Sequence, residues 1–560
     1  MASFIFDGSA SVTAAKADNV FITANPALFV SEAQVGSNVV LTYSNGNTIT
    51  VTGTTLGDNT TNLPGVSLAN GTFATGANVD AVTAGQNGLF FNGTNAIATA
   101  PLTGTGAYTA NSVHAIFGGL GRSDSVDGAD SIQIGGKGSF LVYGNAGADI
   151  ISQGVAGTGT VATGGNAFDS TSFVTVFGGK NDLGNDSILL ANTSNSGAKM
   201  AIYGGEGTDS INIFNTGTSA NTAIFGGQGA ADSTDLADSI AFNGGGTVSI
   251  FANAGNDVVT LGNFGAAGNG LDSTANVTVH GGIGSDNIAI KVNNVAATVV
   301  AYGDENTPGT ANADSISVTG TTGTTVIYGG TAAADSNDNA DVITYSGQGT
   351  ATIYAGGGDD SVVINTTGTF IDAAGTATAN NGAAATASSS SNTTVFLGNG
   401  NDSINILNTG NGLTAATGTQ TVTGGAGSDT FTIGSNTNSA TATVSAQGSG
   451  TGITITDFTV GVDVLKVNNG TTAAATVTVS NVAAGGSLQQ ALDLAANNAT
   501  GNAANGTAAA GTVSVVAFNG DTYVVVSNDT ASGFQANSDL AIKLTGVTDA
   551  ATVAANIVVV

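Results

Sequence analysis

The sequence contains no cysteine, no tryptophan and only two histidines, His114 and His280. Without cysteine, the chain can form neither disulfide bonds nor thiolate metal sites. Two histidines are too few ligands for ordinary zinc chemistry. Without tryptophan, any platform that stacks on sugars would depend on tyrosine and phenylalanine.

Basic residues are also scarce. The chain has 8 Lys and Arg against 38 Asp and Glu, which gives a formal net charge of −30. Binding to nucleic acid needs clustered Lys and Arg, so no nucleic-acid partner is expected. The same reasoning argues against anionic membrane surfaces. An excess of carboxylates favours cations instead.

Long apolar runs are absent as well. No run reaches 18 residues, so no transmembrane segment is expected. The first twenty residues lack the basic region and the continuous apolar core of a Sec-type signal peptide. If the protein is exported, we expect its export signal to lie elsewhere.

The chain is rich in glycine, with 85 of 560 residues, and 41% of its residues are hydrophobic. The hydrophobic residues alternate with polar ones through runs of Val, Ile, Phe, Tyr and Thr, which is typical of strands that face a core on one side. A disordered acidic chain would lack this periodic apolar content. The composition therefore predicts a folded, all-β protein.

One stretch, AIYGGEGTDSINIF at Ala201 to Phe214, recurs along the chain. Each copy has an apolar alternation, a glycine-rich loop that ends in Asp, and a second alternation. A repeat with a fixed period indicates a stacked architecture, and one copy is too small to bury its own apolar face. We therefore expect a parallel β-solenoid. Aligned on the residue before the glycines, the copies are most often 26 residues apart and lie at Phe117, Tyr143, Phe177, Tyr203, Phe225, Phe251, His280, Tyr302, Tyr328, Tyr354, Phe396 and Thr423.

We predict three regions. Residues 1–110 form a β-rich N-terminal region for attachment or assembly, with a hairpin around Asn45-Gly46. Residues 111–448 form the solenoid, with residues 371–392 as a low-complexity loop extruded between two repeats. Residues 449–560 form a β-rich C-terminal domain. It begins with a closing cap near 453–467 and contains one short helix after Ser487 and a hairpin at Asn519-Gly520.

An aspartate lies directly before the second strand of every repeat. Ca²⁺ takes 6 to 8 oxygen ligands from carboxylates and backbone carbonyls, and glycine-rich loops can turn their carbonyls inward. Gly and Asp also form ordinary turns, but a turn needs no carboxylate at a fixed place. Stacked carboxylates without a cation would also repel one another. We therefore expect Ca²⁺ shared between turns, with the candidate ligands Asp130, Asp149, Asp186, Asp209, Asp238, Asp257, Asp286, Asp314, Asp341, Asp360, Asp402 and Asp429.

The pattern Gly-Gly-x-Gly-x-Asp followed by alternating apolar residues resembles the repeat-in-toxin (RTX) family, whose parallel β-roll binds calcium. The resemblance covers about 113–433. Most acidic loops here are about 16 or more residues apart, whereas the family's nine-residue units run in tandem, which suggests calcium on one side of each turn only. Five loops, such as Gly329 to Asp341, are also stretched. By analogy, glycine carbonyls would be ligands, at Gly205, Gly207, Gly282, Gly284, Gly425 and Gly427.

The C-terminal segments from Thr456 to Leu465, Gly520 to Val526 and Ser538 to Val547 look like the ends of proteins exported by type I secretion. That resemblance implies an uncleaved C-terminal export signal, the type I secretion machinery as a partner, and folding outside the cell.

An enzyme is not expected. The chain has neither the His-Glu-x-x-His motif of metalloproteases nor the Gly-x-Ser-x-Gly motif of α/β-hydrolases. His114 and His280 lie beside repeat strands and are interpreted as structural. A carboxylate pair for glycoside hydrolysis stays open as an alternative because Asp is plentiful.

The composition resembles that of bacterial S-layer proteins whose assembly depends on calcium. The leading hypothesis is a secreted structural protein that assembles with copies of itself into a surface layer or filament on the cell. A cell-surface polysaccharide is a further candidate partner. The alternative is a calcium-dependent extracellular adhesin that binds a ligand through its N-terminal region.

Overall fold

The computed structural model forms two compact units, Met1–Gly262 with Thr274–Ile283 and Asn263–Ser273 with Gly284–Val560. The division falls within the repeats, so each unit contains solenoid strands. The structure describes residues 3–6, 8–15, 19–22, 29–53, 66–68, 71–72, 88–91, 113–117, 129–134, 139–153, 168, 172–179, 183–192, 198–215, 220–230, 232–262, 271, 275–292, 297–304, 312–320, 323–331, 333, 338–347, 349–365, 369–371, 377–379, 392–407, 419–434, 452–468, 477–480, 486–498, 512–527, 533–534 and 539–560.

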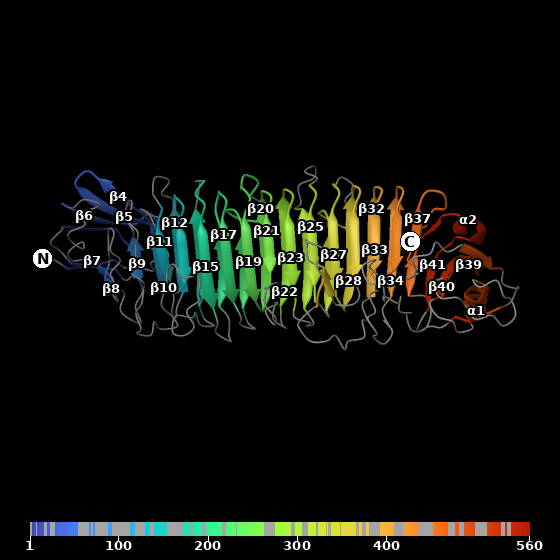
Figure 1. Ribbon diagram of the computed structural model, residues 1–560. Coiled ribbons are helices and arrows are strands. Elements are labelled where there is room, and N and C mark those ends of the chain that lie inside the picture. The colour runs from blue at the N-terminus through green and yellow to red at the C-terminus, as the bar shows by residue number, and fades with distance from the viewer. Residues whose placement is uncertain are drawn as a thin grey trace. The chain divides into compact units, whose positions relative to one another are not determined.

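In the first unit each repeat contributes two strands to two parallel sheets, and successive repeats pair in register (Figure 1). The first sheet comprises β10 (Val113–Phe117), β12 (Ser139–Asn145), β14 (Phe173–Gly179), β16 (Lys199–Tyr203), β18 (Asn221–Phe225), β20 (Thr247–Ala254) and β22 (Asn276–Ile283). The second comprises β11 (Ser131–Ile134), β13 (Ile150–Gln153), β15 (Ser187–Asn192), β17 (Ser210–Asn215), β19 (Ser239–Gly244) and β21 (Val258–Leu261). Figure 1 shows β15, β17 and β19 side by side.

The second unit repeats this arrangement. Its first sheet comprises β24 (Thr298–Asp304), β26 (Thr324–Tyr328), β28 (Thr350–Gly357), β32 (Asn392–Asn399), β34 (Gln420–Ala426), β36 (Ile453–Ile455) and β41 (Leu540–Leu544). Its second sheet comprises β23 (Asn287–Lys291), β25 (Ser315–Thr319), β27 (Val342–Ser346), β29 (Ser361–Asn365), β33 (Ser403–Leu407), β35 (Thr430–Gly434), β37 (Val464–Val467) and β42 (Ile557–Val559). The predicted fold class, an all-β parallel β-solenoid, is confirmed.

The alternation of the sequence sets the two faces of each strand. In β17, Ile211 and Ile213 are fully buried between the sheets while Ser210 and Asn212 face outward. The residues before the glycines, on which the repeats were aligned, form a column in register on the outer face. Their rings stack on one another with centroids 4.6–5.3 Å apart, from Tyr143 to His280 in the first unit and from Tyr302 to Phe396 in the second.

The insertion at 371–392 leaves the register unbroken. Strands β28 and β32 pair directly across it, with Tyr354 opposite Phe396. Part of the insertion forms the antiparallel pair β30 (Thr369–Ile371) and β31 (Ala377–Ala379). Residues 380–391 lie outside the described part of the chain.

The N-terminal region contains the predicted hairpin, since β5 (Asn38–Tyr43) and β6 (Thr48–Thr52) pair antiparallel, and Gly46 has a φ of +83°. The repeats also begin one strand earlier than predicted, because β9 (Gly88–Phe91) pairs in parallel with β10 and sets Phe91 opposite Phe117. The remaining strands there are β1 (Ser3–Phe6), β2 (Val12–Ala15), β3 (Asn19–Ile22), β4 (Phe29–Val35), β7 (Val66–Leu68) and β8 (Gly71–Thr72).

The predicted closing cap is a further repeat. Strands β36 and β37 pair with β34 and β35, and the chain then adds β41 and β42 beyond them. The predicted helix is α1 (Leu488–Asn498). It begins with a capping box in which Ser487 and Gln490 exchange side-chain-to-backbone hydrogen bonds. A second helix, α2 (Ala550–Ala554), was not predicted.

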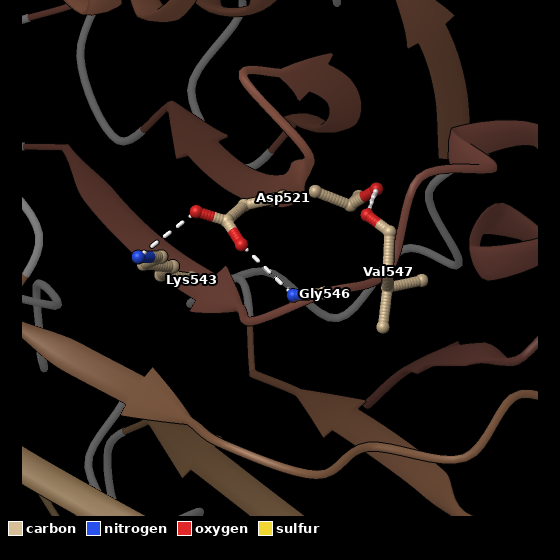
Figure 2. Close-up of polar contacts among 5 residues, drawn as sticks. Asp521, Lys543, Gly546 and Val547 are labelled. Carbon is tan, nitrogen blue, oxygen red and sulfur yellow. Dashed lines mark hydrogen bonds and ion pairs between the residues drawn. The ribbon is translucent and has the colours of Figure 1, made fainter.

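Strands β38 (Val477–Ser480), β39 (Thr512–Phe518) and β40 (Asp521–Ser527) complete the C-terminal domain, and β39 and β40 form the predicted hairpin. Two of the segments that resemble the ends of type I secretion substrates, Gly520 to Val526 and Ser538 to Val547, contact each other. Figure 2 shows the Asp521 carboxylate between Lys543 Nζ, at 2.9 Å, and the N–H of Gly546, at 2.8 Å. Within the described residues, no helix is long and apolar enough to cross a membrane.

Candidate functional site

The predicted aspartates form a continuous line within each unit, at the turn that leads into the second strand of each repeat. All are buried. We call this line the aspartate ladder. It comprises Asp130, Asp149, Asp186, Asp209, Asp238 and Asp257 in the first unit, and Asp286, Asp314, Asp341, Asp360, Asp402, Asp429 and Asp463 in the second.

One oxygen of each carboxylate joins two repeats. Within each unit, the Oδ1 atom of every ladder aspartate after the first accepts the backbone N–H of the ladder aspartate one repeat earlier, at N···O distances of 2.7–3.0 Å. For example, Asp238 accepts from Asp209, and Asp314 accepts from Asp286. The ladder therefore satisfies a backbone donor in each turn, which an ordinary turn would leave to water.

The other oxygen has a different environment. In the described part of the chain, the Oδ2 atoms of Asp238, Asp314 and Asp341 are buried and have no hydrogen-bond partner. Each lies against a glycine, where a Cβ would collide with it; at Gly226, Gly303 and Gly329 the same Cβ would also collide with a carbonyl oxygen of the next repeat. A carboxylate oxygen and a carbonyl oxygen, both acceptors, therefore lie against each of these three glycines, and the carboxylate oxygen has no donor among the described atoms.

Burial makes these carboxylates difficult to ionise. It raises the pKa of Asp257 and Asp314 from 3.8 to about 7, and that of Asp360 to about 8. Burial also raises the pKa of Asp238 and Asp341, each helped by an additional neighbouring carboxylate. An ionised ladder at neutral pH therefore requires a compensating positive charge.

The C-terminal end of the ladder differs. Asp463 accepts the N–H of Asp429 through Oδ1 and the N–H of Thr459 through Oδ2, so both oxygens have donors. Asp457 accepts the N–H groups of Gly424 and Gly425, both at 2.8 Å. Sequence reasoning missed Asp463 as a ladder member, although it precedes an apolar alternation as the others do.

The six glycines proposed as carbonyl ligands all have positive φ, from +99° at Gly425 to +144° at Gly207. Only glycine adopts these angles without strain. A side chain at Gly207 would collide with the carbonyl of Gly184, and one at Gly427 with that of Gly400. The glycines thus permit close stacking of the loops, and their role as metal ligands stays a prediction.

Within the described residues, no three His, Cys, Asp or Glu side chains gather closely enough to hold a metal ion. A cation on the ladder would therefore depend on single carboxylates of adjacent repeats together with backbone carbonyls. Hard, oxygen-binding cations such as Ca²⁺ accept such donors. The donor set fits calcium in its chemistry, because it offers oxygen atoms only and includes buried carboxylate oxygens without donors in the described part of the chain.

The enlarged loops bring further carboxylates to the ladder. Asp235 and Asp304 are buried beside Asp238 and Asp314 and were absent from the predicted ligands. Asp235 lies three residues from both Asp232 and Asp238, a spacing that could have indicated it, whereas Asp304 has no such neighbour. A comparison of the chain with models of known protein families and with curated protein sequences gives no match.

Proposed function

We propose that this protein is a secreted structural protein that binds calcium along the aspartate ladder and assembles with copies of itself into a surface layer or filament. One observation carries the proposal: the buried ladder positions are aspartate where asparagine would suit an unmetallated fold better. An asparagine Oδ1 would accept the same backbone N–H. Its Nδ2 would place a donor beside the carbonyl that now faces Oδ2.

Every described ladder position is nevertheless aspartate, although the sequence uses asparagine freely elsewhere. A buried carboxylate costs stability unless a proton or a cation compensates its charge. In neutral solution, a cation that accepts both the carboxylate oxygen and the facing carbonyl would compensate it. Ca²⁺ would supply positive charge to the ladder when bound, with Asp238, Asp314 and Asp341 among the residues that hold it.

Calcium binding would in turn make folding conditional on calcium. The chain has a formal net charge of −30, and much of it lies in stacked loops where like charges repel. Because the ladder forms only when the repeats stack, an ion that binds the ladder stabilises the folded state over the unfolded one. The resemblance to RTX proteins and to type I secretion substrates supports folding outside the cell, where calcium is plentiful.

The outer faces of the solenoid support self-assembly. Their side chains are mostly uncharged, as in β20, where Thr247, Ser249 and Phe251 face outward. Such neutral faces can pack against copies of the same chain once the loops are neutralised. A structural role also agrees with the absence of protease and hydrolase motifs from the sequence.

The test has two steps on the purified full-length chain. Far-UV circular dichroism with and without a chelator should show the β signal weakened or its melting lowered when calcium is removed. Electron microscopy should then show sheets or filaments after calcium is added. An unchanged spectrum and melt, with no bound metal, would refute calcium binding; a stable monomer in millimolar calcium would refute self-assembly and favour the adhesin.

A further inference from the structure

Three of the enlarged loops share a second acidic motif. The sequence Asp-Ser-x-Asp-x-Ala-Asp occurs at 124–130, 232–238 and 335–341. Its last aspartate is in each case a ladder residue, namely Asp130, Asp238 or Asp341. The first two aspartates are additional, so these loops carry two more carboxylates than the ladder uses. A turn of this kind does not require them.

The loop at 232–238 is the best described of the three. Asp235 is only 6% exposed; its Oδ1 accepts the N–H of Leu236 at 2.9 Å, and its Oδ2 has no hydrogen-bond partner among the described atoms. Asp232 Oδ2 accepts the N–H of Gln228 at 3.0 Å. The Oδ2 atoms of Asp232 and Asp235 both lie 2.8 Å from the point where a Cβ on Gly227 would be, so the two carboxylates converge.

An asparagine from the next repeat meets the same point. Asn253 Nδ2 also lies 2.8 Å from the Cβ position of Gly227, and it donates to the carbonyl of Gly229 at 2.5 Å. Asn253 is fully buried, and in the described part of the structure its Oδ1 has no hydrogen-bond partner. In the structure the Nδ2 arm of this amide therefore faces the two carboxylates, and a half-turn of the amide about χ2 would bring its Oδ1, an oxygen of the kind that calcium accepts, to them instead.

The backbone makes Asn253 more informative. Its φ is +83°, a left-handed angle that glycine adopts freely and that asparagine tolerates better than most other residues, and its register partner in the next strand is Gly282. The equivalent position is glycine in most described repeats, for example Gly205 and Gly227. The backbone therefore accepts asparagine here, and what distinguishes the position from its glycine equivalents is a buried polar side chain.

The repeats in which the position equivalent to Asn253 is not glycine lie next to the loops with the Asp-Ser-x-Asp-x-Ala-Asp motif. Asn145 takes the position in the repeat after the 124–130 loop; its φ is +77°, it is 2% exposed, and neither side-chain polar atom has a hydrogen-bond partner among the described residues. Asp304 takes it in the repeat before the 335–341 loop and is 5% exposed near Asp338. Each motif loop thus has a buried Asn or Asp on an adjacent repeat, and the other described repeats have glycine: Gly179, Gly205, Gly227, Gly282, Gly330, Gly356, Gly398 and Gly425.

We propose that the loop with Asp232 and Asp235, together with Asn253, is a divalent-cation site distinct from the ladder, suited to Ca²⁺. The two carboxylates match the charge of one divalent ion, and the amide oxygen and loop carbonyls supply neutral donors. The ladder supplies one carboxylate in every repeat, whereas this site arises only where the motif and the Asn or Asp coincide. Its chemistry agrees with the proposed function, but it uses other residues and can fail separately.

Native mass spectrometry of the full-length chain during calcium titration counts the bound ions. We expect Asp235→Asn and Asn253→Gly each to bind one ion fewer than the unmodified chain. Asn253→Gly is the sharper variant, because glycine is the residue that this backbone prefers and the fold should not suffer. Glu206→Gln, which removes a charge from the neighbouring loop, is the matched control and should bind the full number. Circular dichroism in calcium checks that every variant is folded.

The outcomes separate the two proposals. If the unmodified chain binds calcium but both variants bind the same number of ions, the separate site is wrong and the ladder proposal stands. If the variants lose an ion while Asp314→Asn, a ladder variant, does not, the separate site stands and the ladder proposal is wrong. A chain that binds no calcium at all would overturn both. If Glu206→Gln also loses an ion, the loss reflects general charge and the site is overturned.

Discussion

Replacement of Asp314 by asparagine should have opposite effects on stability with and without calcium. In the structure Asp314 Oδ1 accepts the N–H of Asp286 at 2.7 Å, and an asparagine Oδ1 would do the same. The asparagine Nδ2 would replace the Oδ2 that lies beside the carbonyl of Gly329 and would add the missing donor. Without calcium, the substitution thus removes a buried charge and leaves the packing almost unchanged.

The magnitude follows from the pKa. Burial raises the pKa of Asp314 from 3.8 to about 7. Each unit by which the pKa differs between the folded and unfolded states corresponds to about 1.4 kcal/mol. At pH 8 the ionised carboxylate therefore costs up to about 4 kcal/mol, and local relaxation reduces this to about 2–4 kcal/mol. In chelator, Asp314→Asn should be more stable by that amount. At calcium concentrations about one hundred times Kd, it should instead lose part of the roughly 2.7 kcal/mol that a bound ion supplies.

Urea unfolding at pH 8, followed by far-UV circular dichroism, measures both effects. The control is Asp359→Asn, which removes an exposed charge in the same unit; an asparagine Oδ1 can accept the hydrogen bonds that Asp359 accepts from Asn401, so neither midpoint should shift appreciably. Equal stabilisation with and without calcium would show that no cation binds Asp314. Equal destabilisation in both conditions would show that asparagine does not replace the carboxylate in this turn and would refute the predicted cost of the buried charge.

Three further predictions test other parts of the reasoning. In chelator, the free energy of unfolding should fall as the pH rises from about 4 to about 8, because the raised pKa values of Asp257 and Asp314 mean that the folded state holds more protons than the unfolded state across this window. Each such carboxylate should lower the free energy of unfolding by about 2–3 kcal/mol between pH 5 and pH 8, as measured by thermal melts. Bound calcium should make the stability less dependent on pH. A stability that rises with pH in chelator would contradict the prediction. Gly204→Ala should lower the free energy of unfolding by about 2–3 kcal/mol or more, because the new Cβ would collide with the Gly226 carbonyl and the Asp209 carboxylate. Gly229→Ala should unfold like the unmodified chain, because a Cβ at Gly229 would have no described atom within 4 Å. Asp521→Asn should lose only about 0.2–1 kcal/mol, measured in urea, and less at high salt, because its ion pair with Lys543 is partly exposed; a loss above about 2 kcal/mol would mean that this contact organises the C-terminal domain.

Much of the solenoid could be predicted from the sequence because its units are local. Alternation of period two places Ile211 and Ile213 on the inner face whatever the neighbouring repeats do. The hairpin at Asn45-Gly46 and the capping box at Ser487 also depend on contacts within a few residues. The extension of the repeats to Phe91 was missed because the stretch after it, residues 92–112, contains no aspartate and therefore no acidic loop.

The candidate site was predictable only in part. The sequence by itself determined where the aspartates lie along each repeat, because their position before an apolar strand follows from the repeat alignment. Only the tertiary structure decided what each carboxylate contacts, because Asp314, Asp286 and Gly329 meet across repeats that stack in register. The same holds for Asn253, whose approach to Asp232 and Asp235 depends on the stacking of two repeats. Hydrogen bonds and burial between stacked repeats join residues about 20–40 positions apart, and no local pattern specifies which oxygen is left without a donor.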